Sequence, residues 1–173
     1  MKYSCSQFDS KSDDLDQAEE NMLQLYLDRA GIQANQNILD LGCGWGSFSL
    51  FAAAKFPTSK FTAVSNSKDQ INYINEQARS RGLNNLSAIQ KNINEMRFNE
   101  TFDKVISIEM FEHMRNYESL LSKVSNFLKP DGELFVHIFC HRFACYLYEA
   151  KNESDWMTRN FFEGGVMPSE DIF

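Results

Sequence analysis

Short apolar runs alternate with amphipathic segments along most of the chain. Five apolar runs, each bounded by polar or turn-forming residues, predict buried strands at 38–41, 60–64, 86–90, 104–108 and 133–139. Between them, apolar residues recur at helical spacing, which predicts helices at 15–30, 48–54, 68–81 and 117–128. Strands that alternate with helices indicate an α/β fold with a parallel sheet and right-handed crossovers.

Turn and cap residues refine these boundaries. Ser67 and Gln70 form the pattern of a capping box at the start of a helix, in which each side chain bonds the other residue's backbone N–H. Lys129–Gly132 predicts a turn between the last helix and the last strand. Pro168–Asp171 predicts the start of a further helix.

The stretch Ile38–Leu50 organises the rest of the chain. An apolar strand leads into Gly42, Gly44 and Gly46, and a helix follows. Glycines permit positive φ and let a ligand approach bare backbone, while the helix N-terminus offers unpaired N–H groups. Such a unit binds nucleotides, although a glycine turn of this kind also occurs in α/β proteins without that role. The third glycine comes one residue earlier than in the dinucleotide fingerprint, and Asp40 lies two residues before the first.

Polar residues near the carboxyl ends of the predicted strands mark the expected site. In parallel sheets the ligand lies outside these ends, near the point where the strand order reverses. We therefore expect five segments to converge there: the glycine turn, Ser65–Asn66, Ile93–Asn94, Glu109–His113 and the stretch after Phe139.

Composition narrows the function classes. The 173 residues make one domain, and 17 basic against 24 acidic residues give a formal net charge of −7, which argues against nucleic acid as a main partner. No N-terminal apolar region indicates a signal peptide, and the tract Leu134–Tyr148 is too interrupted by charged and histidine residues to span a membrane. The cysteines form no C-x-x-C pair, so we expect reduced thiols in a cytoplasmic protein. They are Cys5, Cys43, Cys140 and Cys145.

Eight segments, spread over nearly the whole chain, carry a family resemblance. They are Tyr3–Cys5, Leu15–Met22, Leu39–Ser47, Val64–Lys68, Ser107–Glu118, His137–Arg142, Glu153–Phe162 and Met167–Ser169. Within them, D-x-G-x-G-x-G at Asp40–Gly46 is the pattern of class I S-adenosylmethionine-dependent methyltransferases. The chain resembles the cyclopropane-fatty-acid-synthase-like methyltransferases, and most of all their coclaurine N-methyltransferase branch.

The resemblance implies a class I methyltransferase fold, which is Rossmann-like with three layers and a mainly parallel sheet between helices. A complete sheet of this class has seven strands, and we count five before Phe173, so we expect the chain to lack a C-terminal part. Within a single domain at 1–173, we expect an N-terminal lid segment at 1–12, a Rossmann-like core at 13–140 and the start of the acceptor-site region at 141–173.

The cofactor implied by the resemblance is S-adenosylmethionine. Gly42 and Gly44 would let the backbone close on its methionine portion. Asp40 would take its ammonium group, directly or through water, or would instead cap the turn. In the resembling family Tyr3 and Ser4 would close over the cofactor, although they could also be an irrelevant tail. Ile93 and Asn94 match positions around the adenine, although they could also be ordinary loop. Ser65, Asn66 and Gln70 stand where many methyltransferases carry an acid for the ribose, and they could supply hydroxyl and amide partners.

Three residues after the fourth predicted strand are the catalytic candidates. An acceptor amine must lose its proton before methyl transfer, because an ammonium ion has no lone pair. Glu109, Glu112 and His113 lie at the expected pocket mouth, where burial would raise a carboxyl pKa toward the useful range. Alternatively, Glu112 and His113 cap or orient the next helix. In the resembling N-methyltransferases the matching glutamate and histidine are implicated in catalysis.

The lipid-modifying relatives suggest a different use of the same region. They hold a bicarbonate base with a cysteine, a glutamate and a histidine, which match Cys5, Glu112 and His137. Such a base would deprotonate the carbocation that forms when an alkene attacks the methyl group; His137 could also be a histidine of the core. His137 and His141 share a strand face without a third ligand in view, so we expect no metal.

The sequence therefore leaves three functions open. N-methylation of a small-molecule amine is favoured by the segment Met110–Tyr117. The alternatives are cyclopropane-type modification of unsaturated lipid acyl chains and a truncated cofactor-binding module without activity. The expected partner is a small-molecule amine or a lipid acceptor.

Overall fold

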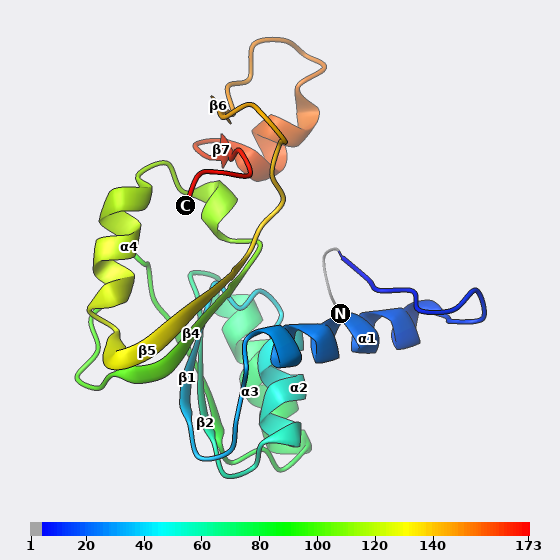
Figure 1. Cartoon of the computed structure of the whole chain (residues 1–173), viewed down its shortest axis with the longest axis vertical. Helices are drawn as coiled ribbons and strands as arrows, with labels where there is room; N and C mark the ends of the chain where they lie inside the picture. The colour runs from blue at the N-terminus through cyan, green and yellow to red at the C-terminus, as the bar shows by residue number, and fades with distance from the viewer. Residues whose placement is uncertain (1–4) are drawn as a thin grey trace.

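Five parallel strands form the centre of the protein, in a computed structural model that describes residues 5–173. The order of the strands is β3-β2-β1-β4-β5, with β1 in the middle (Figure 1). This order reverses beside β1, which is where a ligand of such a sheet binds. The bounds are β1 Asn37–Leu41, β2 Lys60–Ser65, β3 Leu86–Gln90, β4 Phe102–Ile108 and β5 Leu128–His137.

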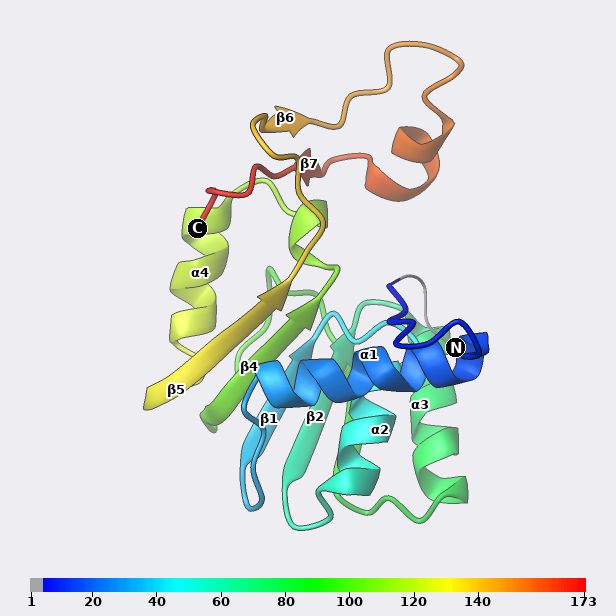
Figure 2. The ribbon, with the colours of Figure 1, turned by 45° about the vertical axis from the view of Figure 1, so that its right-hand side comes forward.

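Helices cover both faces of the sheet, as Figure 2 shows. Three of them lie on one face and α4 lies on the other, because successive strand residues point to opposite sides. Ile38 packs with the first group, and its neighbour Leu39 packs with α4. The expected α/β fold with helices on both faces is thereby confirmed. The helices are α1 Leu15–Arg29, α2 Ser47–Lys55, α3 Lys68–Ser80 and α4 Tyr117–Ser125, and the 3-10 turn η1 Phe111–His113 precedes α4.

The capping box predicted at α3 is half formed. Ser67 accepts a hydrogen bond from the Gln70 backbone N–H, at 3.5 Å. The Gln70 side chain does not return the bond to Ser67, because its amide oxygen accepts from the Ser65 hydroxyl at 2.6 Å. The Ser67 N–H donates to Ser65 Oγ instead, at 3.1 Å. Ser65 thus joins the end of β2 to the start of α3.

Two predicted elements differ in the structure. The turn expected at Lys129–Gly132 lies inside β5, where pairing with β4 jumps from Phe102↔Leu128 to Lys104↔Glu133. The turn residues therefore form a bulge within the strand. The helix expected at Pro168–Asp171 is wrong, since Ser169 forms a bridge with His141 and a turn follows.

Residues 141–173 form a separate layer above the carboxyl ends of β4 and β5 (Figure 2). Strands β6 Tyr146–Leu147 and β7 Val166–Met167 pair antiparallel, and the π-helical turn η2 Thr158–Phe162 lies between them. Gly165 packs so closely on η1 that a Cβ there would lie 2.3 Å from the Glu112 carbonyl oxygen. Across residues 5–173, the helices are too short or too polar to cross a membrane.

Candidate active site

The glycine turn after β1 has the backbone that its sequence predicts. Gly42, Gly44 and Gly46 all have positive φ, at 83°, 53° and 78°. A Cβ on Gly42 would lie 2.5 Å from Met110 Cγ, and one on Gly46 would lie 2.6 Å from Ile74 Cγ1. Gly42 is therefore required for packing against Met110, a reason that differs from the ligand approach expected from the sequence.

Backbone hydrogen bonds fix where this turn points. The N–H groups of Gly42 and Cys43 both donate to the Val64 carbonyl of β2, at 3.0 and 2.9 Å. Gly46 then occupies the N-cap position of α2 and has no side chain to cap the helix. The turn thus presents backbone and a helix N-terminus at the carboxyl end of β1, an arrangement that favours anionic or polar ligand groups.

Asp40 lies beneath this turn, only 2% exposed. Ser49 of α2 donates its hydroxyl to Asp40 Oδ2 at 2.5 Å. Burial raises the Asp40 pKa from 3.8 to about 7, and the bond from Ser49 partly opposes the shift. These contacts make Asp40 a brace between β1 and α2.

The end of β2 supplies the next group of expected residues. Ser65 is buried and bonded to Gln70, as described above. Asn66 is exposed, and its carbonyl accepts from Gln90 Nε2 of β3 at 3.0 Å. The structure therefore brings Ser65, Asn66 and Gln70 together beside the glycine turn.

The loop after β3 is held in place by α4. Ile93 and Asn94 offer their carbonyl oxygens to Lys123 Nζ, at 3.0 and 2.7 Å. Ile93 is partly buried against the cluster on the α4 face, and Asn94 is exposed. Lys123 thus positions both expected residues, although nothing in the sequence marked it.

A second set of expected residues meets at the ends of β4 and β5. The Cys5 thiol, a Glu109 carboxylate oxygen and a His137 ring nitrogen all lie within 4.8 Å of one another. Glu109 has a positive φ of 52°, a conformation that costs energy for a residue with a side chain. Its carboxylate lies 3.7 Å from His137 Nε2. The Tyr26 ring packs edge-on against His137, with centroids 5.1 Å apart.

This grouping differs from the expected one in two ways. The glutamate beside Cys5 and His137 is Glu109, whereas the resemblance assigned Glu112. The absence of a metal was expected because the histidines lacked a third ligand, but Cys5 and Glu109 bring two further ligand types to His137. His141 lies apart from this group, and its Nδ1 accepts from the backbone of Phe143 and Ala144.

Glu112 is the most unusual charged side chain of the region. It is 1% exposed, and among the described residues neither carboxylate oxygen has a hydrogen-bond partner. Burial raises the Glu112 pKa from 4.5 to about 7, and the nearby charge of Glu109 adds to the shift. A buried carboxyl without a partner is costly for stability, so its presence points to function.

Aromatic side chains surround this carboxyl. Tyr117 and Tyr148 both have a pKa raised to about 12, mainly by burial and in part by the charge of Glu112. The Tyr148 ring lies 5.0 Å from Phe162, and the His113 ring stacks on Phe162 at 5.4 Å. Burial lowers the His113 pKa, whereas a hydrogen bond with the Phe161 backbone opposes the shift. A carboxylate inside an aromatic lining suits a cationic or amine ligand.

Comparison with known proteins identifies the family. A family model described as mycolic acid cyclopropane synthetase matches residues 1–172. The chain belongs to this family. Among curated relatives, it is 42% identical to (S)-coclaurine N-methyltransferase of Thalictrum flavum subsp. glaucum over 100% of the chain and 48% of that protein. Its identity to the cyclopropane-fatty-acyl-phospholipid synthase of Escherichia coli K12 is 28%, over 98% of the chain and 42% of that protein.

Solved members of the cyclopropane synthetase family share the fold. A coclaurine N-methyltransferase bound to N-methylheliamine and SAH superposes with a TM-score of 0.91 at 42% identity, covering 98% of this chain and 51% of that one. The cyclopropane synthase MmaA2 of Mycobacterium tuberculosis gives a TM-score of 0.82 at 23% identity, covering 99% of this chain and 63% of that one. The chain thus spans about half the length of the curated relatives it matches.

Several site residues in this family member were not predicted from the sequence. Tyr26 lies within the helix predicted at 15–30, and its ring packs on His137. Tyr117 and Tyr148 approach Glu112 from α4 and from the layer at 141–173. Glu112 was itself predicted, because two glutamates and a histidine are unusual so close to the end of an apolar strand.

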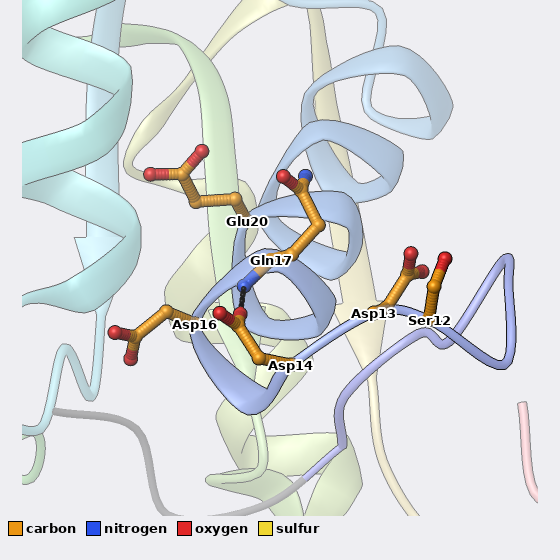
Figure 3. A pocket seen from close by; sticks show the side chains of 6 residues that line it. All are labelled: Ser12, Asp13, Asp14, Asp16, Gln17 and Glu20. Carbon is orange, nitrogen blue, oxygen red and sulfur yellow. Dashed lines mark hydrogen bonds between the residues drawn. The ribbon is translucent and has the colours of Figure 1, made fainter.

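Acidic residues also gather at the start of α1, where they line a hollow of about 410 Å³ (Figure 3). Asp14 accepts a hydrogen bond from the Gln17 N–H at 2.9 Å and so caps the helix. Carboxylates in a first helical turn are stabilised by the helix dipole. We therefore interpret this cluster as a helix start. The residues that line it are Ser12, Asp13, Asp14, Asp16, Gln17 and Glu20.

Proposed function

We propose that the protein is an S-adenosylmethionine-dependent methyltransferase that methylates the nitrogen of a small-molecule amine. The observation that carries this proposal is Glu112, a buried carboxyl without a hydrogen-bond partner among the described residues, inside an aromatic lining. Support also comes from the relatives above, among them a coclaurine N-methyltransferase bound to SAH.

The residues of the glycine turn fit this cofactor. Three glycines with positive φ lead to an uncapped helix N-terminus, and the Ser65 hydroxyl and Gln70 amide lie at the neighbouring strand end. When bound, S-adenosylmethionine would supply a methyl group activated by its sulfonium. We assign its binding to Gly44, Ser65, Asn66 and Gln70 together with the loop at Ile93–Asn94; Asp40 supports the turn from below, and Tyr3 and Ser4 lie outside the described residues.

Glu112 would act on the acceptor. With a pKa near 7 it can accept a proton from an incoming ammonium ion at neutral pH and can then hold the neutral amine in line for methyl transfer. His113 would orient the acceptor, because its ring is stacked on Phe162 and bonded to the Phe161 backbone. The aromatic side chains exclude water from the reacting atoms. The layer at 141–173 would thus form part of the acceptor site, and 13–140 the cofactor-binding core.

A second function has an observation of its own. Cys5, Glu109 and His137 form a group that could hold a base or an anion, as needed when an alkene is methylated in an unsaturated acyl chain. Under the leading proposal, Glu109 instead orients His137, whose Nε2 lies 3.7 Å from the Glu109 carboxylate. In both cases we expect a cytoplasmic protein, because no disulfide joins the cysteines of residues 5–173.

Methyl-labelled cofactor separates these functions. The chain is incubated with the label and either a cyclic secondary amine or vesicles of unsaturated phospholipid, and calorimetry measures cofactor binding in parallel. Label in the amine supports the proposal, with Glu112→Gln as the matched control that loses it. Label in lipid alone would reject the proposal in favour of the second function. Cofactor binding without transfer to either acceptor would indicate a binding module.

A further inference from the structure

A thiol, a carboxylate and an imidazole converge beside the carboxyl ends of β4 and β5. The Cys5 thiol, a Glu109 carboxylate oxygen and a His137 ring nitrogen lie within 4.8 Å of one another. In tetrahedral zinc sites the nitrogen and oxygen ligands lie about 2.0–2.2 Å from the metal, which places them about 3.4 Å apart. The 3.7 Å between Glu109 Oε1 and His137 Nε2 is close to that separation. A small rotation of the exposed Cys5 side chain completes the set.

Backbone contacts hold the three residues in place. The Glu109 N–H donates to the His137 carbonyl at 2.7 Å, so these two ligands stand on adjacent strand ends. The segment that carries Cys5 is docked on α1, because the Gln7 N–H donates to the Ala18 carbonyl at 2.9 Å. Figures 1 and 2 both show this segment beside α1. The donor atoms are therefore brought together by ordered backbone from three parts of the chain.

Two of the three residues have an unusual backbone conformation. Across residues 5–173, positive φ outside glycine occurs at Cys5 with 58°, at Glu109 with 52° and at Asn35 with 64°. Asparagine tolerates this region, whereas cysteine and glutamate are seldom found in it. Strained residues of this kind cluster at sites that clamp a ligand. That Cys5 and Glu109 meet at the same histidine indicates that the cluster is built to hold something.

The chemistry of the donors favours a zinc ion. Thiolate and imidazole are zinc ligands, whereas magnesium and calcium prefer oxygen ligands alone. A divalent cation would offset the negative charges of the Cys5 thiolate and the Glu109 carboxylate, and the same carboxylate would repel an anion. The Tyr26 ring packs edge-on against the His137 ring, with centroids 5.1 Å apart, and so helps to orient this ligand.

We propose that Cys5, Glu109 and His137 bind a zinc ion whose fourth position is open to water. The Glu109 and His137 side chains are each 21% exposed and Cys5 is exposed, so the metal can enter from solvent. The bound ion ties the N-terminal segment to the ends of β4 and β5. This site goes beyond the proposed methyl transfer and does not depend on it, because Glu112 takes no part in it.

Metal titration tests the site on the reduced chain, freed of metal by a chelator. Calorimetry should show one zinc ion bound per chain, and zinc should raise the thermal midpoint. Cobalt should occupy the same site and give the near-ultraviolet charge-transfer band of a thiolate ligand, which zinc then abolishes. An absence of zinc binding, or cobalt binding without that band, would overturn the proposal. Binding of ¹³C-labelled bicarbonate in place of zinc would overturn it too and would assign the cluster to the second function.

Matched variants assign the metal to these residues. Cys5→Ser should weaken zinc binding at least about 100-fold and remove the charge-transfer band, because the thiolate is the ligand. Glu109→Gln keeps the shape without the charge and should weaken zinc binding at least about tenfold. Cys145→Ser and Glu118→Gln are the controls at exposed positions outside the cluster, and they should bind zinc as the original chain does. Unchanged zinc affinity in Cys5→Ser would show that the metal binds elsewhere and would reject the site.

Discussion

Glu112 is buried at a cost to stability, and we propose that it acts on the acceptor amine. If it deprotonates or steers an acceptor amine, Glu112→Gln keeps the shape but removes the charge, and turnover should fall by roughly 10²–10⁴-fold. Cofactor affinity should barely change, because the glycine turn and the Ser65–Gln70 pair lie elsewhere. Steady-state rates and calorimetric titration of the variant measure the two effects separately.

The pH dependence distinguishes a base from an orienting group. If Glu112 is the base, the rate of Glu112→Gln should recover at high pH, where the amine is already neutral. If Glu112 only orients the substrate, the deficit should be about tenfold and flat with pH. Loss of cofactor binding with intact turnover per bound complex would contradict the catalytic assignment and place Glu112 in the cofactor site.

Two buried carboxyls should make the protein less stable as the pH rises. Asp40 and Glu112 titrate near 7 when folded, against 3.8 and 4.5 when unfolded. Between these values the folded protein holds protons that the unfolded chain has released, so the free energy of unfolding falls with rising pH. Glu112→Gln should flatten that fall by on the order of 2 kcal/mol between about pH 5 and pH 8. Urea unfolding at several pH values measures this, and an unchanged slope would mean that Glu112 is ionised in the folded state.

The glycine turn is the element on which cofactor binding should depend. Gly44→Val places a branched side chain at a φ of 53°, where it strains the backbone of the turn to which we assign the cofactor. We expect S-adenosylmethionine binding to be lost in a protein that remains folded. Gly82→Val is the matched control, since Gly82 also has a positive φ, of 68°, with open space around its Cβ position. Near-normal affinity in Gly44→Val would show that the turn is structural only.

The Asn75 side chain of α3 hydrogen-bonds both backbone groups of Ala88 in the edge strand β3. Removing this side chain should lower the free energy of unfolding. Asn75→Ala leaves two backbone groups of Ala88 without partners, and each lost bond costs about 1 kcal/mol. We expect the urea midpoint to fall and the Ala88 amide to exchange faster. Glu76→Ala, at an exposed position of the same helix, controls for helix propensity. Equal effects of both variants would mean that the amide bonds contribute nothing specific.

Most of the fold could be predicted because its central strands β1, β2 and β4 are largely buried on both faces and are therefore continuous apolar runs. Strands β1 to β4 lie within about two residues of their predicted positions. The prediction failed at Lys129–Gly132, because residues that favour a turn also favour a bulge. Local sequence cannot choose between the two, since the choice depends on how β5 meets Phe102 of the neighbouring strand.

The site was predictable where it depends on backbone and less so where it depends on side-chain direction. The glycine turn and the segment Glu109–His113 follow from strand ends meeting at one edge of the sheet. The partners of His137 do not, because Glu109 reaches it through a positive φ and Tyr26 reaches it from a helix distant in sequence. Tertiary packing decides such contacts, and a sequence pattern records only the face on which each residue lies.

The molecule has two parts, a sheet with its helices and the layer at 141–173, and Gly165 joins them at Glu112. Gly165→Ala would put a Cβ 2.3 Å from the Glu112 carbonyl oxygen, so the upper layer must move away from η1. Water would then reach the Glu112 carboxyl, and its pKa should fall from about 7 toward 4.5. A carboxyl ¹³C NMR titration measures that pKa directly. Gly164→Ala is the control: Gly164 has a φ of 85° and open space around its Cβ position, so the backbone is strained without displacing the layer. If Gly165→Ala lowers stability but leaves the Glu112 pKa near 7, then the sheet and its helices alone bury the carboxyl, and the upper layer is not what tunes it.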